Sequence, residues 1–478
     1  MTVTRPYHVA IIGGGVTGLS CAWHLQQQAT EASLDVTYTL LESSDRWGGK
    51  IRTDTVDGYA DTPFVVEGGP DSVLTQKPWA IQMARQMGLG ERLWPTNDDR
   101  RQTFVVHKGK PMPLPDGVLL IVPTKIKPFA LSPLISPLGK LRMGLDLFIP
   151  PKTDGEDETL ADFMRRRLGA EALDKLAEPL LSGIYNADAE KQSLLATFPR
   201  FRDLEVKYGS LMKGMLASRK ARPSPPKNGQ KSSMFTSFRN GMQELVDGIL
   251  PHLQGDLRLG TAVQSIQPLE SGYHLTLQNG ETLDVDAVVL AIPAFAAAEL
   301  IKPFRPQAAE DLQGIRYVST GTISLAYRRE EIGHPLNGFG IVIPRSEKRC
   351  VNAITWSSTK FNNRAPDGFV LLRAFFGGSR TPEMMTVGDD KLLATVCAEL
   401  ESLMGVNARP LFHKIYRWTK SNPQYDVGHL DRIERIEAAM PSGLFVTGSP
   451  YRGVGVPDCV RQAQQTAVKI IQSLPQPA

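Results

Sequence analysis

The chain has 478 residues, of which 41% are hydrophobic and 22% are charged, so it exceeds the usual size of one hydrophobic core and predicts two or three domains. Its 42 glycines and 35 prolines follow no period, which excludes a collagen-like chain. The formal net charge of +4, from 54 basic and 50 acidic residues, gives no reason to expect a nucleic-acid partner.

The four cysteines are far apart and form no C-x-x-C pair, so neither a disulfide framework nor a zinc knuckle is expected, and a cytoplasmic location fits best. The first residues have no basic region followed by a long apolar stretch, which argues against a signal peptide. No window reaches the roughly 18 consecutive apolar residues that span a bilayer, so no transmembrane segment is expected. The eight histidines show no H-x-x-x-H spacing, and no metal site is expected.

The first elements predict one β-α-β unit. His8–Gly13 is a short apolar run that stops at glycine, as buried parallel strands do. Val16–Gln28 suits a helix, and Val36–Glu42 suits a second strand. Another helix is expected over Trp79–Met87, because it follows Pro78 directly and proline favours the first turn of a helix.

The next part of the chain predicts an inserted helical domain. Val105–Pro151 is rich in proline and aliphatic residues, and Thr159–Leu181 shows helical periodicity. We expect Pro128–Pro151 to belong to this insertion and to allow only weak peripheral contact with a membrane surface. Its prolines, together with Lys140 and Arg142, prevent a spanning helix.

Arg219–Ser233 combines proline, glycine, serine and basic residues without apolar anchors, which is typical of an exposed loop at a domain boundary. After it, a helix is expected over Gly241–Leu253. Three strands then return the chain to the first domain, at Leu257–Ile266, His274–Leu277 and Val285–Ile292.

Four strand-like runs predict an antiparallel sheet in the last third of the chain, at Thr320–Tyr327, Gly338–Ile343, Val351–Trp356 and Phe369–Phe376. Three more elements are expected after it: a helix around Lys391–Met404, a buried strand at Gly443–Thr447 and a closing helix at Pro457–Gln472.

A dinucleotide-binding fingerprint stands where the first strand meets the first helix. The motif G-x-G-x-x-G is satisfied by Gly13, Gly14, Gly15, Val16, Thr17 and Gly18. In this motif the first glycine makes the turn, the second lets a diphosphate approach the backbone, and the third lets the helix pack on the strand. Glu42 ends the next strand, 24 residues after Gly18, where a carboxylate accepts the ribose hydroxyls and repels a 2′-phosphate. FAD and NAD remain as candidates.

Further clusters of small residues favour FAD. Arg46–Lys50 follows Glu42 closely and supplies Gly48, Gly49 and flanking cations where a diphosphate must lie against a loop, which NAD-only dehydrogenases do not need. Glu67–Ser72 suits a backbone that passes close to a planar ring, and Gly448–Asp458 precedes the closing helix, whose N-terminus can point at a ligand.

These clusters resemble the flavoprotein family of monoamine oxidases, phytoene desaturases and protoporphyrinogen oxidases. The resemblance is strongest to the soluble bacterial protoporphyrinogen and coproporphyrinogen oxidases of haem synthesis, and it covers nearly the whole chain. It includes three segments that resemble regions peculiar to the porphyrinogen oxidases: Glu178–Tyr185, Ala196–Pro199 and Pro423–His429.

The resemblance implies an α/β fold like that of p-hydroxybenzoate hydroxylase, with a Rossmann-type FAD-binding domain built from non-contiguous segments. The expected domains are FAD-binding segments at 1–108, 226–305 and 426–478, a helical insertion near the substrate entrance at 109–225, and an antiparallel substrate-binding domain at 306–425.

The resemblance also implies which residues contact FAD. The glycine motif and Lys50 would lie beside the diphosphate, with Gly49 in the second loop, and Glu42 and Ser43 at the adenosine ribose. The other expected contacts are the backbone of Val263 at the adenine, and the residues around the flavin: Gly69, Pro70, Asp71, Ser72, Trp418, Val454, Gly455 and Val456.

Lys77 and the run Arg165–Arg167 are cations with different expected roles. Lys77 comes five residues after Ser72 and is the first cation after that loop, so we expect it to anchor a carboxylate of the substrate; an ordinary surface lysine is the alternative. Arg165–Arg167 are expected to form a solvated helix face rather than a site.

The resemblance implies that the chain removes six hydrogens from a porphyrinogen in three rounds, with O2 accepting the electrons and giving H2O2. Coproporphyrinogen III is the expected substrate and protoporphyrinogen IX the alternative, and another enzyme of haem synthesis is a candidate partner that the sequence does not identify. An amine oxidase is more distant, because that family places an aromatic residue near the position of Val456. A flavin-binding scaffold without activity needs only the fold.

Overall fold

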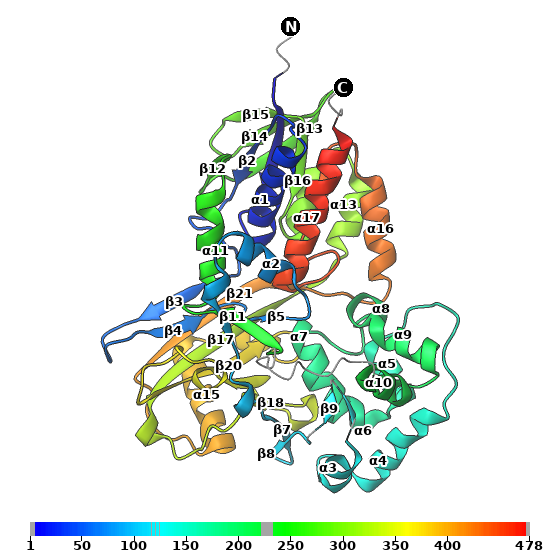
Figure 1. Ribbon diagram of the computed structural model, residues 1–478, viewed down its shortest axis with the longest axis vertical. Helices are drawn as coiled ribbons and strands as arrows, with labels where there is room; N and C mark the ends of the chain where they lie inside the picture. The colour runs from blue at the N-terminus through cyan, green and yellow to red at the C-terminus, as the bar shows by residue number, and fades with distance from the viewer. Residues whose placement is uncertain (1–4, 116, 120, 124, 221–232, 475–478) are drawn as a thin grey trace.

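The computed structural model describes residues 5–115, 117–119, 121–123, 125–220 and 233–474, so most of the loop predicted at Arg219–Ser233 lies outside the described residues. The molecule is elongated (Figure 1). One end carries a parallel sheet with its helices and both chain ends, and the other end carries a large antiparallel sheet beside a helical domain.

A five-stranded parallel sheet, in the order β12-β2-β1-β16-β22, forms the centre of the first domain. Val9 and Ile11 of β1 enter the core on one face, and Ala10 and Ile12 enter the core on the other, because successive side chains of a strand point in opposite directions. Both faces are therefore buried at the centre of the sheet, which is why Val9–Ile12 and Ala287–Leu290 are wholly apolar runs. The strands are β1 (Tyr7–Ile12), β2 (Val36–Leu41), β12 (Asp256–Arg258), β16 (Ala287–Leu290) and β22 (Leu444–Val446).

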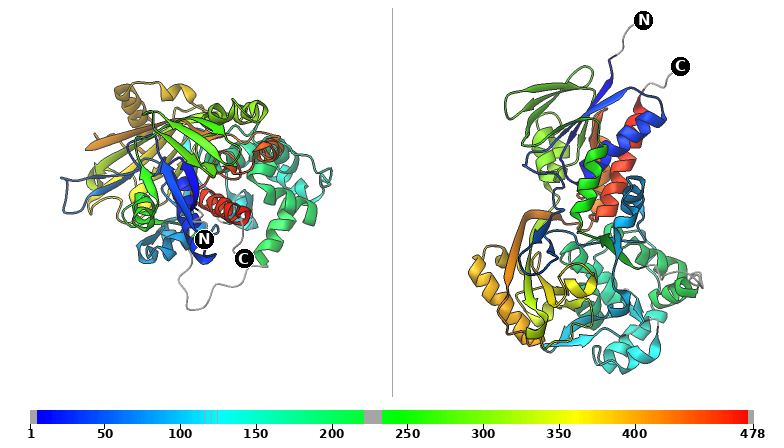
Figure 2. Two further views of the ribbon diagram at one scale, coloured as in Figure 1. Left: turned by 90° about the horizontal axis from the view of Figure 1, so that it is seen from above. Right: turned by 60° about the vertical axis from the view of Figure 1, so that its left-hand side comes forward.

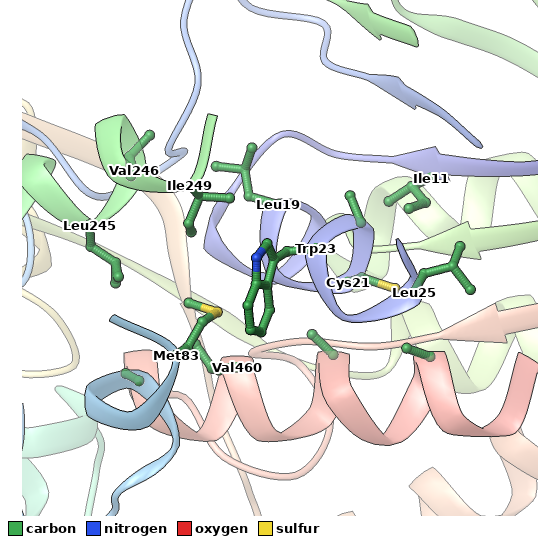
Figure 3. Close-up of a cluster of buried hydrophobic side chains, with 14 of the residues drawn as sticks. Ile11, Leu19, Cys21, Trp23, Leu25, Met83, Leu245, Val246, Ile249 and Val460 are labelled. Carbon is green, nitrogen blue, oxygen red and sulfur yellow. The ribbon is translucent and has the colours of Figure 1, made fainter. Parts of the chain in front are cut away.

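Helices cover one face of this sheet, and a small antiparallel sheet with three helices covers the other. On the first face, Trp23 points toward Met83 and Val460 (Figure 3). The helices of this face are α1 (Val16–Glu31), α2 (Trp79–Gln86), α11 (Gln243–Ile249) and α17 (Val456–Ser473). The second face is covered by β13 (Val263–Pro268), β14 (Tyr273–Leu277), β15 (Thr282–Val285), α12 (Ala294–Ile301), α13 (Pro306–Gln313) and α16 (His429–Ala439).

Two predicted strands are each divided in the structure. The strand predicted at Leu257–Ile266 is wrong as a single element, because Gly260 takes a φ of 61° and separates β12 in the parallel sheet from β13 in the antiparallel sheet. The strand predicted at Val285–Ile292 likewise begins as the end of β15 and continues as β16. Local apolar pattern does not reveal the change of partner.

The second sheet has seven strands, in the order β21-β17-β20-β19-β18-β7-β8. Leu372 and Ala374 of β20 pack with Leu392 and Val396 of α15 (Asp389–Met404), which leaves Arg373 on the opposite face. The strands are β7 (Thr103–His107), β8 (Lys110–Pro113), β17 (Tyr317–Arg328), β18 (Gly340–Val342), β19 (Ala353–Trp356), β20 (Phe369–Gly377) and β21 (Phe412–Pro423). β7 thus lies in this sheet, although residues 1–108 were expected to belong to the FAD-binding domain.

Short strands join the two large domains. A hairpin of β3 (Thr53–Val56) and β4 (Phe64–Glu67) packs against the second sheet, and β11 (Phe235–Phe238) pairs with β5 (Val73–Leu74) and β6 (Leu93–Pro95). At this junction Glu67 and Arg364 are both buried, with their charged atoms 3.7 Å apart. Burial raises the pKa of Glu67.

The helical insertion lies beside the antiparallel sheet (Figure 2). Within the helix predicted at Thr159–Leu181, Gly169 takes a φ of 93° and divides it into α5 (Leu160–Arg167), α6 (Ala170–Ala172) and a π-helix, η4 (Leu173–Ser182). The other elements are β9 (Val118–Leu119), β10 (Val122–Pro123), α3 (Ile126–Leu131), α4 (Pro137–Gly144), η3 (Leu145–Leu147), α7 (Gly183–Tyr185), α8 (Leu194–Thr197), α9 (Pro199–Tyr208) and α10 (Leu211–Lys220). In the described part of the chain, no helix is both long and apolar enough to cross a membrane.

The expectation of a solvated face at Arg165–Arg167 is wrong for Arg167. Its side chain is fully buried, and it donates to Asp146 Oδ1 at 2.6 Å and to the Gly209 carbonyl at 2.9 Å. Glu205, also buried, accepts from Arg202 Nη1 at 3.0 Å. A paired ionic network therefore occupies part of the core of the insertion.

Candidate functional site

A cavity of about 1760 Å³ extends from the carboxyl ends of the parallel strands to the second sheet and the helical insertion. This volume exceeds the roughly 300–1,000 Å³ of an ordinary ligand pocket, so it has room for more than one small ligand. Its walls include Glu42 at the end of β2, Phe375 of the second sheet and Leu181 of the insertion.

The structure shows two of the roles that the fingerprint predicts for the glycine motif, and it leaves space for the third. Gly13 takes a φ of 111°, which makes the turn. A Cβ on Gly18 would lie 1.8 Å from the Gly13 carbonyl oxygen, so the helix packs directly against the turn. A Cβ on Gly15, by contrast, would meet only the Gly49 Cα, at 3.9 Å. The open position is the one where a diphosphate would approach the backbone.

Glu42 is held by the glycine motif itself. Its Oε2 accepts a hydrogen bond from the Gly14 N–H at 2.6 Å, and its Oε1 accepts one from the Ser44 N–H at 2.8 Å. Glu42 and Ser43 both line the cavity. The carboxylate is therefore fixed in position and retains lone pairs for the hydroxyls of a ribose.

The second loop lies against the first. The Gly48 N–H donates to the Gly14 carbonyl at 2.8 Å. Arg46 faces its own loop, where it donates to the Gly49 carbonyl and, at 3.0 Å, to the Ile51 carbonyl. Lys50 instead lines the cavity and donates to the Ser421 carbonyl. Burial lowers its pKa, and no carboxylate among the described residues forms an ion pair with it.

The loop from Gly68 to Ser72 is fixed from two sides. Trp418 Nε1 donates to the Gly68 carbonyl at 2.8 Å, and Arg373 Nη2 donates to the Gly69 carbonyl at 2.7 Å. Asp71 points to Lys360, with 2.9 Å between the carboxylate and the ammonium. Burial opposes the charge of Asp71, but Lys360 and Arg373 hold its pKa well below its ordinary value.

The closing helix begins at the same cavity. Gly455 caps α17 and Gly15 caps α1, and neither helix has a side chain bonded to its first N–H groups. Val16 and Thr17 of α1 and Val456 of α17 line the cavity. Two uncapped helix N-termini supply N–H donors and positive partial charge to one space, which suits an anionic ligand.

Lys77 lines the cavity, as we expect from the sequence, but it already has a partner. Its Nζ lies 2.6 Å from Asp458 Oδ2 in the first turn of α17. Its side chain is 39% exposed, whereas that of Asp458 is 9% exposed. An ammonium has three N–H donors, so Lys77 can still donate to a ligand.

Most of the residues expected at FAD line this cavity, but three do not. Gly14 lies behind the wall, where it bonds Glu42, Gly18 packs on Gly13, and Asp71 turns toward Lys360. The residues expected at FAD that lie in the wall are Gly13, Gly15, Val16, Thr17, Glu42, Ser43, Gly49, Lys50, Gly69, Pro70, Ser72, Val263, Trp418, Val454, Gly455 and Val456; Lys77, expected at the substrate, also lies there.

Arg373 and three further arginines of the cavity wall were not predicted from the sequence. Arg373 is 4% exposed, lines the wall and has an Nε without a hydrogen-bond partner in the described structure. Its signal was a single charge in the apolar run of β20. Three exposed arginines also line the cavity, and no described residue forms an ion pair or side-chain hydrogen bond with them: Arg100, Arg101 and Arg200.

The cavity fits FAD on these observations. The gap beside Gly15, the two uncapped helix N-termini and the unpaired ammonium of Lys50 suit a diphosphate, and fixed Glu42 suits a ribose. No group of three or more histidine, cysteine or acidic residues suited to a metal ion occurs in the part of the chain that the structure describes.

Comparisons with known proteins show the family of the chain. The family described as flavin containing amine oxidoreductase matches residues 16–471. The chain is 36% identical to coproporphyrinogen III oxidase of Bacillus subtilis, over 96% of both chains. It is 33% identical to the chloroplastic protoporphyrinogen oxidase of Nicotiana tabacum, over 96% of this chain and 84% of that protein.

Solved structures have the same architecture. A crystal structure assigned as a protoporphyrinogen oxidase from Exiguobacterium sp. 255-15 matches 98% of this chain and 100% of its own, with a TM-score of 0.86 and 31% identity. A variant of putrescine oxidase matches 98% of this chain and 99% of its own with a TM-score of 0.70 at 19% identity, and this likeness concerns the fold alone.

Proposed function

The chain belongs to the family of flavin-containing amine oxidoreductases, and on that premise we propose that it oxidises coproporphyrinogen III to coproporphyrin III with FAD as cofactor. Protoporphyrinogen IX is the second candidate, since the tobacco relative bears that name. Overall, one porphyrinogen and three O2 would give one porphyrin and three H2O2. When bound, FAD supplies the hydride acceptor and passes the electrons on to O2.

The observation that carries this proposal is the two-part lining of one cavity. The glycine motif, Glu42 and Lys50 make a polar part that suits the cofactor. The other part, between the insertion and the second sheet, has apolar walls that include Leu180, Leu181, Met215, Phe339 and Phe375. A tetrapyrrole needs an apolar slot of this kind.

Cations in the same cavity suit the carboxylates of the substrate. Arg100, Arg101 and Arg200 line it without an acidic partner among the described residues, and Lys77 can donate beyond its pair with Asp458. Guanidinium groups bind carboxylates with two parallel hydrogen bonds. We assign these four side chains to the orientation of the macrocycle, while FAD carries the redox step.

Reduction of the flavin without oxygen tests the proposal. The FAD-loaded protein should lose its visible flavin absorption when coproporphyrinogen III is added, and it should recover that absorption when air is admitted. Protoporphyrinogen IX should be oxidised with a lower kcat/KM, because fewer carboxylates reach the arginines. Reduction by primary amines and by neither porphyrinogen would show an amine oxidase, and no reduction by any of them would show a scaffold.

We expect FAD to be bound without a covalent bond. Cys459 is the one cysteine in the cavity wall, and burial raises the pKa of its thiol to about 11, so at neutral pH it stays a protonated and poor nucleophile. Acid precipitation should therefore leave the yellow colour in the supernatant. Colour that stays in the washed pellet would show a covalent flavin, and Cys459→Ser would then identify its attachment.

A further inference from the structure

Arg373 is the one charged residue of β20, and its side chain is buried in the wall of the cavity. Its neighbours in the strand, Leu372 and Ala374, pack in the core on the other face of the sheet. Arg373 therefore points to the face that borders the cavity. A guanidinium stays charged at neutral pH, so the protein holds a positive charge at this place.

The guanidinium of Arg373 has more hydrogen-bond donors than acceptors around it. Its Nη2 donates to the Gly69 carbonyl at 2.7 Å and to Thr322 Oγ1 at 3.4 Å. Its Nε is buried without a partner, and its Nη1 forms no hydrogen bond with any residue that the structure describes. Buried N–H groups normally have acceptors, so these donors suit an acceptor on a bound ligand.

The charges around Arg373 do not balance. Asp71 and Glu67 are the carboxylates whose charges act on it, but each already has a cation as its partner. Lys360 lies 2.9 Å from Asp71, and Arg364 lies 3.7 Å from Glu67. Burial lowers the pKa of Arg373, and the two carboxylates only oppose that shift. An unpaired buried charge is costly, so this group of residues favours a ligand that brings negative charge.

Arg373 lies where the two parts of the cavity meet. A Cβ on Gly69 would lie 1.8 Å from the Lys50 carbonyl oxygen. The loop that Arg373 holds therefore packs directly on the loop that suits the diphosphate of FAD. In the other direction, the Cζ of Arg373 lies 4.9 Å from the centre of the Phe375 ring, which belongs to the apolar part.

The proposed reaction changes the charge of the cofactor. In each round one hydride, which is a proton with two electrons, passes from a C–H bond of the substrate to FAD, and the substrate releases a second proton to water. The transfer adds one negative charge to the cofactor. A positive charge held beside it therefore stabilises the reduced form more than the oxidised form.

We propose that the uncompensated charge of Arg373 stabilises reduced FAD and thereby sets the midpoint potential of the cofactor. This inference rests on the proposed function only in that FAD is bound, and it does not depend on which substrate reduces it. The alternative is that Arg373 only holds the Gly69 carbonyl and with it the loop from Gly68 to Ser72. That role needs an N–H donor but no charge.

The midpoint potential of the bound FAD tests the proposal. It is measured with a chemical reductant and a reference dye, so no porphyrinogen is needed. Arg373→Gln keeps an N–H donor for the Gly69 carbonyl and removes the charge. It should weaken the preference for reduced FAD by about tenfold or more, which lowers a two-electron potential by about 30 mV or more. Arg373→Lys keeps the charge, so its potential should lie closer to that of the unaltered protein.

Asp71→Asn tests the sign of the effect. It keeps the size of the side chain and removes a negative charge that acts on Arg373. The midpoint potential should therefore rise in this variant, whereas it falls in Arg373→Gln. Mere damage to the loop from Gly68 to Ser72 would not shift the potential in opposite directions.

Arg200→Gln is the matched control, because Arg200 is an exposed arginine of the same cavity wall but belongs to α9 in the insertion. It should leave the midpoint potential unchanged. Flavin content and unfolding temperature show whether each variant is folded and holds FAD.

The proposal is overturned if FAD bound to Arg373→Gln has the potential of the unaltered protein, or if Arg373→Gln and Arg373→Lys shift the potential equally. If Arg373→Gln holds no FAD, Asp71→Asn decides, and a potential that does not rise overturns the proposal. A protein with the expected potentials that oxidises no porphyrinogen would contradict the proposed substrate and support the role of Arg373. An unaltered protein that binds no FAD would contradict both.

Discussion

Gly15→Val is expected to give a folded protein that contains no FAD. Gly15 has a φ of −72° and a ψ of 177°, a conformation that any residue adopts, and a Cβ there would meet only the Gly49 Cα, at 3.9 Å. The backbone and its neighbours therefore tolerate a Cβ at this position. The same space is where the diphosphate would reach the backbone and the N-terminus of α1, so two added methyl groups would exclude the cofactor.

The first measurement is the ratio of flavin to protein in the purified variant. The second is the unfolding temperature of the variant and of the unaltered protein after FAD has been removed from both. Gly388→Val is a matched control: Gly388 also caps a 16-residue helix, with φ −61° and ψ 153°, nothing lies within 4 Å of its added Cβ, and it is outside the cavity wall. It should keep full flavin content. Normal flavin content in Gly15→Val would mean that the diphosphate does not pass this glycine.

The sequence predicted the local geometry of the glycine motif because that geometry is set by residues close together in the chain. The turn at Gly13 and the packing of Gly18 are enforced within a few residues. The hydrogen bond from the Gly14 N–H to Glu42 joins the two ends of one β-α-β unit. The number of residues between these ends is nearly fixed by the fold. Because the spacing of the motif sets this geometry, the turn at Gly13 and the close packing at Gly18 could be predicted from the sequence.

The place of Arg373 in the opposite wall could not be predicted from the sequence, because strand pairing creates it. Arg373 reaches the Gly69 carbonyl across 304 positions of the chain, and nothing near either residue encodes that contact. The prediction for Arg167 was wrong for a related reason. A run of three arginines is typical of a solvated helix face, but the fold brings the carboxylates of Asp146 and Glu205 to Arg167. A buried charge is stable only with such partners, and those partners are distant in sequence.

Lys77 lies where the sequence predicted it, but it also forms an ion pair that the sequence did not predict. The sequence placed it near the flavin loop, and it does line the cavity, but its pair with Asp458 joins residues 381 positions apart. An ammonium that neutralises a nearly buried carboxylate has a structural reason to exist without any substrate. The carboxylate-anchor hypothesis must therefore be separated from charge neutralisation.

Lys77→Met is expected to lower kcat/KM for coproporphyrinogen III by about 30-fold, mainly through KM, because the loss of one partner of a partly desolvated charge pair costs about 2 kcal/mol. Lys77→Glu should be worse, since its carboxylate would face both Asp458 and the substrate. Coproporphyrinogen, which has more carboxylates, should lose at least as much as protoporphyrinogen. Flavin content should stay normal in both variants.

A double-mutant cycle with Asp458→Asn decides between the two roles. Asp458→Asn keeps the size of the side chain and releases the ammonium, so an anchoring Lys77 should bind substrate at least as well in that variant. If Lys77 anchors the substrate, Lys77→Met/Asp458→Asn stays as weak as Lys77→Met, because the cation is still missing. If Lys77 only neutralises Asp458, the double variant regains the kcat/KM of the unaltered protein. In that case Arg100, Arg101 and Arg200 would bind the carboxylates of the substrate. These arginines line the same cavity without acidic partners among the described residues.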